Sequence, residues 1–231
     1  MDIIRFLALY VFFLNFLLLN IYIIFKLLKE KNRDNLTFSL ALFFILGLSA
    51  IIINFIYAWI YEIVLISLLH RISFICATYC FYFILNFNLV LLKTKIYFNI
   101  KKQISLGLTY FFIIFAFFFT TNDIKLDKST DWKPEWDYSF TITYIIFSTI
   151  ILLIPILITT HRIYIHLSLK ELKKKIKIFS IGVIGYFSYL YTISLYNSTN
   201  NILLRIIYTF YMISIFLYAY LIYKGSIKSL K

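Results

Sequence analysis

Apolar segments alternate with short polar connections along the whole chain. Seven apolar segments can be delimited, at residues 3–28, 37–60, 63–92, 104–121, 139–165, 178–197 and 202–223. A helix needs roughly 20 apolar residues to cross the ~30 Å hydrocarbon layer of a bilayer, and these segments have about that length. The pattern therefore predicts an all-α fold, a polytopic membrane bundle of seven transmembrane helices that forms a single domain over residues 1–231.

The segments are typical of helices rather than of the strands of a membrane barrel. The stretch 110–119 is apolar at every position, whereas a membrane strand alternates lipid-facing and lumen-facing residues. A helix also satisfies all its backbone hydrogen bonds within one segment. The first segment is too long and too uniformly apolar for a signal-peptide core, so we expect it to be retained. Pro155 should kink the fifth segment.

Composition supports lipid as the solvent of this chain. The 231 residues are 62% hydrophobic and 14% charged, with a mean hydropathy of +0.89. Soluble domains average roughly 45–50% apolar and about 25% charged residues. One soluble globule could not hide so much apolar surface. We therefore expect an integral, multi-pass protein of the cell membrane.

The positive charges are confined to alternate connections. The net charge is +13, and most of the 23 Lys and Arg lie in the first, third and fifth connections and the C-terminal tail. The positive-inside rule then places the C-terminus and these connections in the cytoplasm and the N-terminus outside. Anionic inner-leaflet lipids are expected partners. Nucleic acid is not, because nucleic-acid binders carry their charge on one solvated face.

Three polar side chains within or beside the segments are candidate ligand-binding residues. His70 and Arg71 lie in the third segment, and a charge within a span is a site hypothesis by default. Arg71 could hold an anionic group of an external ligand, snorkel outward, or pair with Glu62. Arg205 begins the last segment at the same external level. A pair of Arg71 and Arg205 facing one cavity would suit an anion.

The connection 122–138 is the only long external one, and it is rich in acids and aromatics. It contains Trp132 and Trp136, beside five acidic residues. One interpretation is a cap over an external pocket, with both tryptophans as ligand-binding residues. The other is an aromatic belt, since Trp favours the headgroup level where a helix enters lipid.

Catalytic motifs were sought without success. The chain has no phosphate-binding Gly-rich loop, no His-Glu-x-x-His and no Gly-x-Ser-x-Gly, so we expect neither an enzyme nor a cofactor or metal. Asn15, Asn54 and Asn86 lie inside segments. They either form interhelical hydrogen bonds or line a polar path for a transported solute.

Thr121-Asn122 directly follows the fourth segment, and the long fourth connection begins there. Together with the seven-span topology, this dipeptide resembles the N-terminal seven-helix sensor region of membrane histidine kinases. Asp123, Ile124 and Lys125 follow where that family has Pro and His. The resemblance implies a sensor region, which that family joins to a cytoplasmic kinase; here the sequence stops at Lys231.

We therefore expect a receptor-like sensor that relays an external or lipid-borne signal to a cytoplasmic signalling protein. A transporter or channel component that moves a small solute is the alternative. The sequence leaves open whether the chain forms a homo-oligomer.

Overall fold

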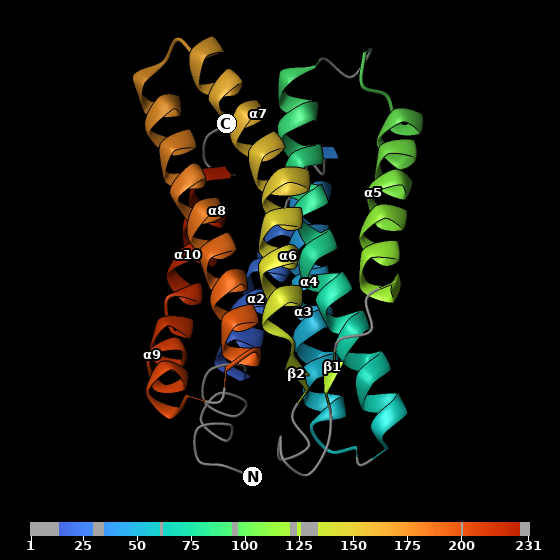
Figure 1. Ribbon diagram of the computed structural model, residues 1–231. Coiled ribbons are helices and arrows are strands. Elements are labelled where there is room, and N and C mark those ends of the chain that lie inside the picture. Colours follow the sequence, from blue (N-terminus) through green and yellow to red (C-terminus); the bar gives the residue numbers. More distant parts are fainter. Residues whose placement is uncertain are drawn as a thin grey trace.

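The computed structural model describes residues 14–29, 35–60, 62–93, 97–120, 124–125, 134–199 and 201–226, and over these it is a bundle of long helices (Figure 1). The helices are α2 (Leu14–Leu28), α3 (Asn35–Tyr57), α4 (Ile63–Leu92), α5 (Ile100–Thr120), α6 (Tyr138–Ser148), the π-helical η3 (Thr149–Leu153), α7 (Ile154–His166), α8 (Lys170–Asn197), α9 (Ile202–Met212) and α10 (Ile215–Ser226). The predicted all-α class is confirmed.

Six stretches of the described residues are long and apolar enough to cross a membrane, which is the character of a multi-pass membrane protein. They are α3, α4, α5, the continuous α6–η3–α7, α8, and α9 together with α10. The remaining predicted segment, the first one at 3–28, is represented by the shorter apolar α2. Its residues 3–13 lie outside the described part of the chain.

Successive helices run in opposite directions, so their connections gather at two ends of the bundle (Figure 1). The carboxyl ends of α2, α4 and α7 and the amino ends of α3, α5 and α8 lie toward the upper end in this view. We call it the cationic end, after Lys26, Lys93, Lys102, Arg162 and Lys177. The α3–α4, α5–α6 and α8–α9 connections lie at the opposite end.

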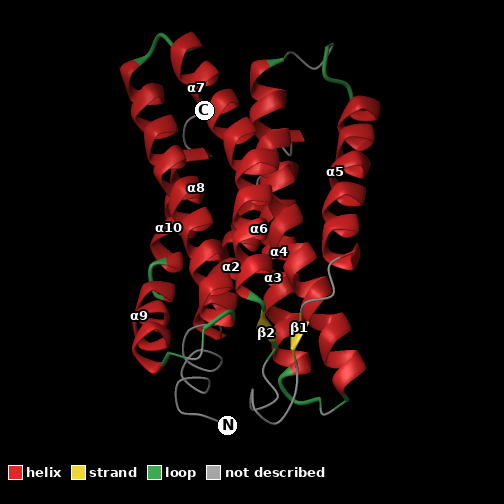
Figure 2. Ribbon diagram, in the orientation of Figure 1, coloured by secondary structure: helices red, strands yellow, loops and turns green. Residues whose placement is uncertain are grey.

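The opposite end carries the only strands of the described residues (Figure 2). β1 (Ile124–Lys125) pairs antiparallel with β2 (Glu135–Trp136). We call this the hairpin end. β1 lies near the start of the predicted long connection 122–138 and β2 lies near its end. Trp136, in β2, is two residues before the first residue of α6.

α4 forms the centre of the bundle, and α5 lies at its edge. α4 buries side chains along its whole length, and it packs against α3, α5 and α7. α5 buries only Gly107, Ile114 and Phe118, so large apolar side chains cover most of its outer surface. An apolar surface of this kind is unfavourable in water but matches hydrocarbon.

α8 and α10 approach so closely that their backbones touch. A Cβ atom on Gly182 would lie 2.7 Å from the backbone nitrogen of Ile222, and one on Gly225 would lie 2.6 Å from the backbone nitrogen of Phe179. Gly185 similarly faces the ring of Tyr218. Small residues permit this close packing in membranes, where van der Waals contact replaces the hydrophobic driving force.

Two irregularities interrupt the predicted segments. The last one, 202–223, is not continuous: α9 ends at Met212 and α10 begins at Ile215, with a turn between them (Figure 2). The fifth contains the π-helical turn η3 directly before Pro155, which lies in the first turn of α7. Because Pro lacks a backbone N–H, the hydrogen-bond ladder must shift there.

Candidate functional site

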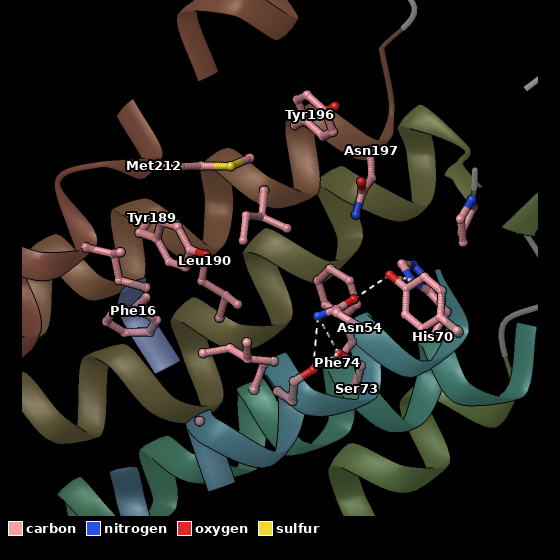
Figure 3. A pocket seen from close by; sticks show the side chains of 18 of the residues that line it. Phe16, Asn54, His70, Ser73, Phe74, Tyr189, Leu190, Tyr196, Asn197 and Met212 are labelled. Carbon is pink, nitrogen blue, oxygen red and sulfur yellow. Dashed lines mark hydrogen bonds between the residues drawn. The ribbon is translucent and has the colours of Figure 1, made fainter. Parts of the chain in front are cut away.

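A cavity of about 130 Å³ lies within the half of the bundle that adjoins the hairpin end. Its walls come from α2, α3, α4, α8, α9 and α10, with Pro134 of the hairpin connection at its edge. Figure 3 shows the polar side chains of Asn54, Ser73 and His70 together on one side, with Phe16, Tyr189 and Met212 at the other end. The cavity thus combines apolar walls with one polar strip, as ligand sites commonly do.

The polar strip is a chain of hydrogen bonds that starts at the hairpin. The indole Nε1 of Trp136 donates to Nε2 of His70 over 2.8 Å. Nδ1 of His70 lies 3.1 Å from the hydroxyl of Tyr57, and that hydroxyl donates to Oδ1 of Asn54. Nδ2 of Asn54 then donates to Oγ of Ser73 over 2.9 Å. The chain therefore joins β2 to α4 and α3.

The indole of Trp136 determines which groups donate and which accept along this chain of hydrogen bonds. An indole N–H can only donate, so Nε2 of His70 must accept. The ring proton of His70 is then on Nδ1, from which it donates to the Tyr57 hydroxyl. A doubly protonated imidazole would place an N–H against the indole N–H of Trp136. The observed geometry therefore requires neutral His70.

Trp136 is buried beside the cavity. Its side chain is 2% exposed, and its ring centroid lies 4.2 Å from that of Phe74 and 4.8 Å from that of Phe140. Trp136 does not itself line the cavity, but it bonds to His70, which does. Its burial is unlike that of an aromatic-belt residue, which would face the headgroups, and the cap over a pocket stays a prediction. Trp132 lies outside the described residues.

Arg71 points away from the cavity. Its Nη1 donates to the carbonyl of Phe118 over 2.8 Å, and its guanidinium lies 6.0 Å from the ring centroid of Phe119. The last carbonyls of a helix have no partner within it and carry partial negative charge. Arg71 therefore closes the carboxyl end of α5.

Arg205 serves a different helix end. Its Nε donates to the carbonyl of Thr199 over 2.8 Å, and its guanidinium lies over the ring of Tyr196. Neither Arg205 nor Arg71 is among the residues that line the cavity. The predicted pair of arginines facing one cavity is therefore not formed, because Arg71 is held by a carbonyl at the end of α5 and Arg205 by the carbonyl of Thr199 in the α8–α9 connection.

Tyr57 and Ser73 belong to the site but were not among the predicted residues. A pattern pointing to them exists in the sequence: Asn54 and Tyr57 are three residues apart, as are His70 and Ser73. Residues at this spacing share one face of a helix. The short α3–α4 connection makes these helices antiparallel neighbours, which lets the two faces meet.

A layer of aromatic rings packs around Tyr186, which is one of the residues that line the cavity. The ring centroids of Phe43 and Tyr186 are 5.3 Å apart, and those of Phe81 and Tyr186 are 5.5 Å apart. Phe43 and Phe81 are almost completely buried. Beyond this layer, Asn86 donates to Ser39 over 2.8 Å in a separate groove among α3, α4 and α5.

The asparagines within helices mostly join helices to one another. Asn54 bonds α3 to α4, and Asn86 bonds α4 back to α3. Asn88 of α4 donates to Oγ1 of Thr160 in α7 over 2.8 Å. These contacts agree with the interhelical role. The described residues contain no cluster of His, Cys, Asp or Glu suited to a metal.

Comparison with models of protein families and with curated proteins gave no match for this sequence. Function must therefore be argued from the cavity, its hydrogen bonds and the charges of the two ends.

Proposed function

We propose that this chain is a seven-span sensor of the cell membrane that binds a small, largely apolar molecule in the cavity near the hairpin end. The observation that carries the proposal is the cavity whose polar strip is attached to the hairpin connection through the Trp136–His70 hydrogen bond. A ligand that rearranges this strip alters the contact between the hairpin and α4.

The proposed orientation follows from the charges of the two ends. The cationic end would face the cytoplasm, by the positive-inside rule, and the hairpin end would face outside. α2 with the residues before it would make the first of seven crossings, which puts the N-terminus outside. In this orientation an external or lipid-borne ligand reaches the cavity from the outer half of the membrane.

The dimensions and lining of the cavity set the class of ligand. A cavity of about 150 Å³ lined by apolar side chains binds benzene, so about 130 Å³ suits a molecule of a single ring or a short chain. The Oγ of Ser73 accepts from Asn54 and donates to the carbonyl of Ala50, which leaves one of its two lone pairs to accept a further hydrogen bond. A ligand with one hydroxyl or amine group would use it.

The helices offer a route from this site to the cationic end. Trp136 immediately precedes α6, which continues through η3 into α7. Tyr144 of α6 and Thr78 of α4 share a buried hydrogen bond of 2.9 Å. We propose that displacement of Trp136 moves this helix, with η3 as the point of adjustment, because π-turns often occur at functional sites. A cytoplasmic signalling protein would read the change at the α7–α8 connection.

A transporter is the less well supported function. It would need a polar path through the bundle, yet Asn54 and Asn86 line separate spaces on the two sides of the layer that contains Phe43, Phe81 and Tyr186.

Phenol is a suitable probe, because it has one ring and one hydroxyl. We expect the full chain in lipid nanodiscs to bind phenol in ligand-observed NMR. Ala50→Phe, which fills the cavity, should abolish binding, whereas Ala116→Phe on the exposed face of α5 should not. Asn54→Leu should weaken the binding of phenol more than the binding of toluene. Equal binding by the Ala50 and Ala116 variants would refute the assignment of the site.

Relay and transport can be separated with the same probe. Phenol should change hydrogen exchange at residues 163–170 in the wild-type chain but not in the Ala50→Phe variant. Reconstituted vesicles should show no flux of phenol or ions above that of protein-free vesicles. Two results would count against a sensor: phenol binding without any change in hydrogen exchange at residues 163–170, and flux of phenol or ions above that of protein-free vesicles.

A further inference from the structure

We propose that the groove between α7 and α8 at the cationic end is a binding site for the headgroup of an anionic phospholipid. The groove has a volume of about 490 Å³. Thr160, His161 and Tyr164 of α7 form one wall, and Lys177 and Ile181 of α8 form the other. This site is separate from the phenol-binding cavity and does not depend on the proposed sensor function.

Positive charge and a polar ring surround the outer part of the groove. The Nζ of Lys177 lies 5.4 Å from the ring centroid of Tyr164, and that of Lys173, one turn nearer the end of α8, lies 5.3 Å from it. Lys173 and Lys177 are one helical turn apart on the same face of α8, so both ammonium groups lie near the ring of Tyr164. Glu171 is two residues from Lys173, and residues at this spacing do not share a helix face.

Of the three hydroxyls that line the groove, those of Thr160 and Ser180 are already used within the protein. Oγ1 of Thr160 accepts from Asn88 and donates to the carbonyl of Ile156. Oγ of Ser180 donates to the carbonyl of Ile176. The groups that remain to bind a phosphate are therefore the ammonium groups of Lys177 and Lys173, the ring of His161 and the hydroxyl of Tyr164.

The inner part of the groove is apolar. Leu157 lies seven residues before Tyr164, which places it about 10 Å deeper along the helix axis at 1.5 Å per residue. Ile181, one turn below Lys177, is 56% exposed. Polarity thus falls from the cationic end inward, as it does from the phosphate to the acyl chains of a lipid. A free phosphate ion would contact only the outer half.

The charge of the headgroup decides the class of lipid. Basic pockets between membrane helices bind anionic headgroups, and each nearby Lys contributes about 1 kcal/mol, or about fivefold in affinity. The anionic headgroup of phosphatidylglycerol matches the cationic outer part of the groove, and its acyl chain matches the apolar inner part. Phosphatidylcholine brings its own cation, which the two lysines repel.

Native mass spectrometry of the full chain with added lipid tests the site. The wild-type chain should retain phosphatidylglycerol in preference to phosphatidylcholine. Lys173→Gln/Lys177→Gln should reduce that retention by about 25-fold, the product of two fivefold losses. The matched control is Lys101→Gln/Lys102→Gln on α5, which removes the same charge at the same end and should reduce retention less than threefold.

Equal retention of the two lipids, or an equal loss in the control, would overturn the proposal, because a diffuse basic surface would then account for binding. Displacement of phosphatidylglycerol by millimolar inorganic phosphate would also overturn it, since the acyl chain would then contribute nothing. Resistance to phosphate, together with weaker retention of dihexanoyl phosphatidylglycerol, supports a lipid in the groove.

Discussion

Trp136 offers a direct test of the hydrogen-bonded strip. Trp136→Phe removes the indole N–H that Nε2 of His70 accepts over 2.8 Å. Both residues are only 2% exposed, so water cannot easily replace the donor. A buried acceptor left without its partner costs about 1–3 kcal/mol. A Phe ring at this position can keep the tilted contact with Phe74 and the edge-on contact with Phe140, so most of the aromatic packing is retained.

The free energy of unfolding should therefore fall by about 1–3 kcal/mol. It is best measured by equilibrium unfolding in mixed micelles, followed by circular dichroism, because tryptophan fluorescence itself changes in the variant. Trp59→Phe is the matched control: Trp59 is 66% exposed, and an exposed substitution should change stability by less than about 0.5 kcal/mol.

A double-mutant cycle with His70→Phe identifies the interaction itself. If the indole and the imidazole bond to each other, removing both partners leaves neither unpaired across this contact. The double variant should then lose at least about 0.5 kcal/mol less than the sum of the two single losses. Strict additivity would refute the assigned hydrogen bond, and with it the attachment of the hairpin to the cavity.

Three further predictions concern helix packing and helix ends. Gly182→Ala should lower the free energy of unfolding by about 1–3 kcal/mol, because the new Cβ would lie 2.7 Å from a backbone nitrogen of α10. Arg71→Gln should speed amide exchange in the last turn of α5, since the charge on the carbonyl of Phe118 is lost. The hydroxyl of Ser139 donates to Asp137 and lowers the pKa of that carboxyl below its ordinary value of 3.8. This stabilisation is present above pH 3.8 and is lost as the pH falls through the folded-state pKa, so Ser139→Ala should make unfolding less sensitive to acid.

Each of these has a control in the same chain. Gly47→Ala places its Cβ only against the hydroxyl of Tyr186, at 3.3 Å, and should be tolerated. Arg205→Gln acts at the α8–α9 connection, so exchange in α5 should not change. Ser198→Ala removes a hydroxyl that donates to the backbone carbonyl of Leu195 and not to an acid, so the acid dependence of this variant should match that of the wild-type chain. If Gly47→Ala lowered the free energy of unfolding as much as Gly182→Ala, the close α8–α10 packing would be contradicted.

The helical segments could be predicted because apolar runs are bounded by charges. α4 has the predicted limits 63–92, between Glu62 and Lys93. Alternation of Lys-rich connections likewise predicted which connections share an end. The break at 213–214 could not be predicted, because neither Ile213 nor Ser214 is a residue that normally interrupts a helix.

The candidate site was harder to predict than the helices. His70 and Trp136 were both singled out, but their contact joins residues 66 positions apart, and no local pattern encodes it. For Arg71 the sequence left three roles open, namely holding an external ligand, snorkelling outward and pairing with Glu62, yet its partner is the backbone carbonyl of Phe118, a group that every residue possesses. Residue type alone identifies an unusual side chain within an apolar segment without identifying what it binds.

The contact between α8 and α10 has a consequence for how this sequence can evolve. At Gly182 and Gly225 a side chain would enter the backbone of the facing helix, so any replacement there requires both helices to move apart at once. The isoleucines on the lipid-facing surface carry no such restriction and can exchange freely with other apolar residues. Descendants of this chain should therefore diverge over most of their surface while these two positions remain glycine.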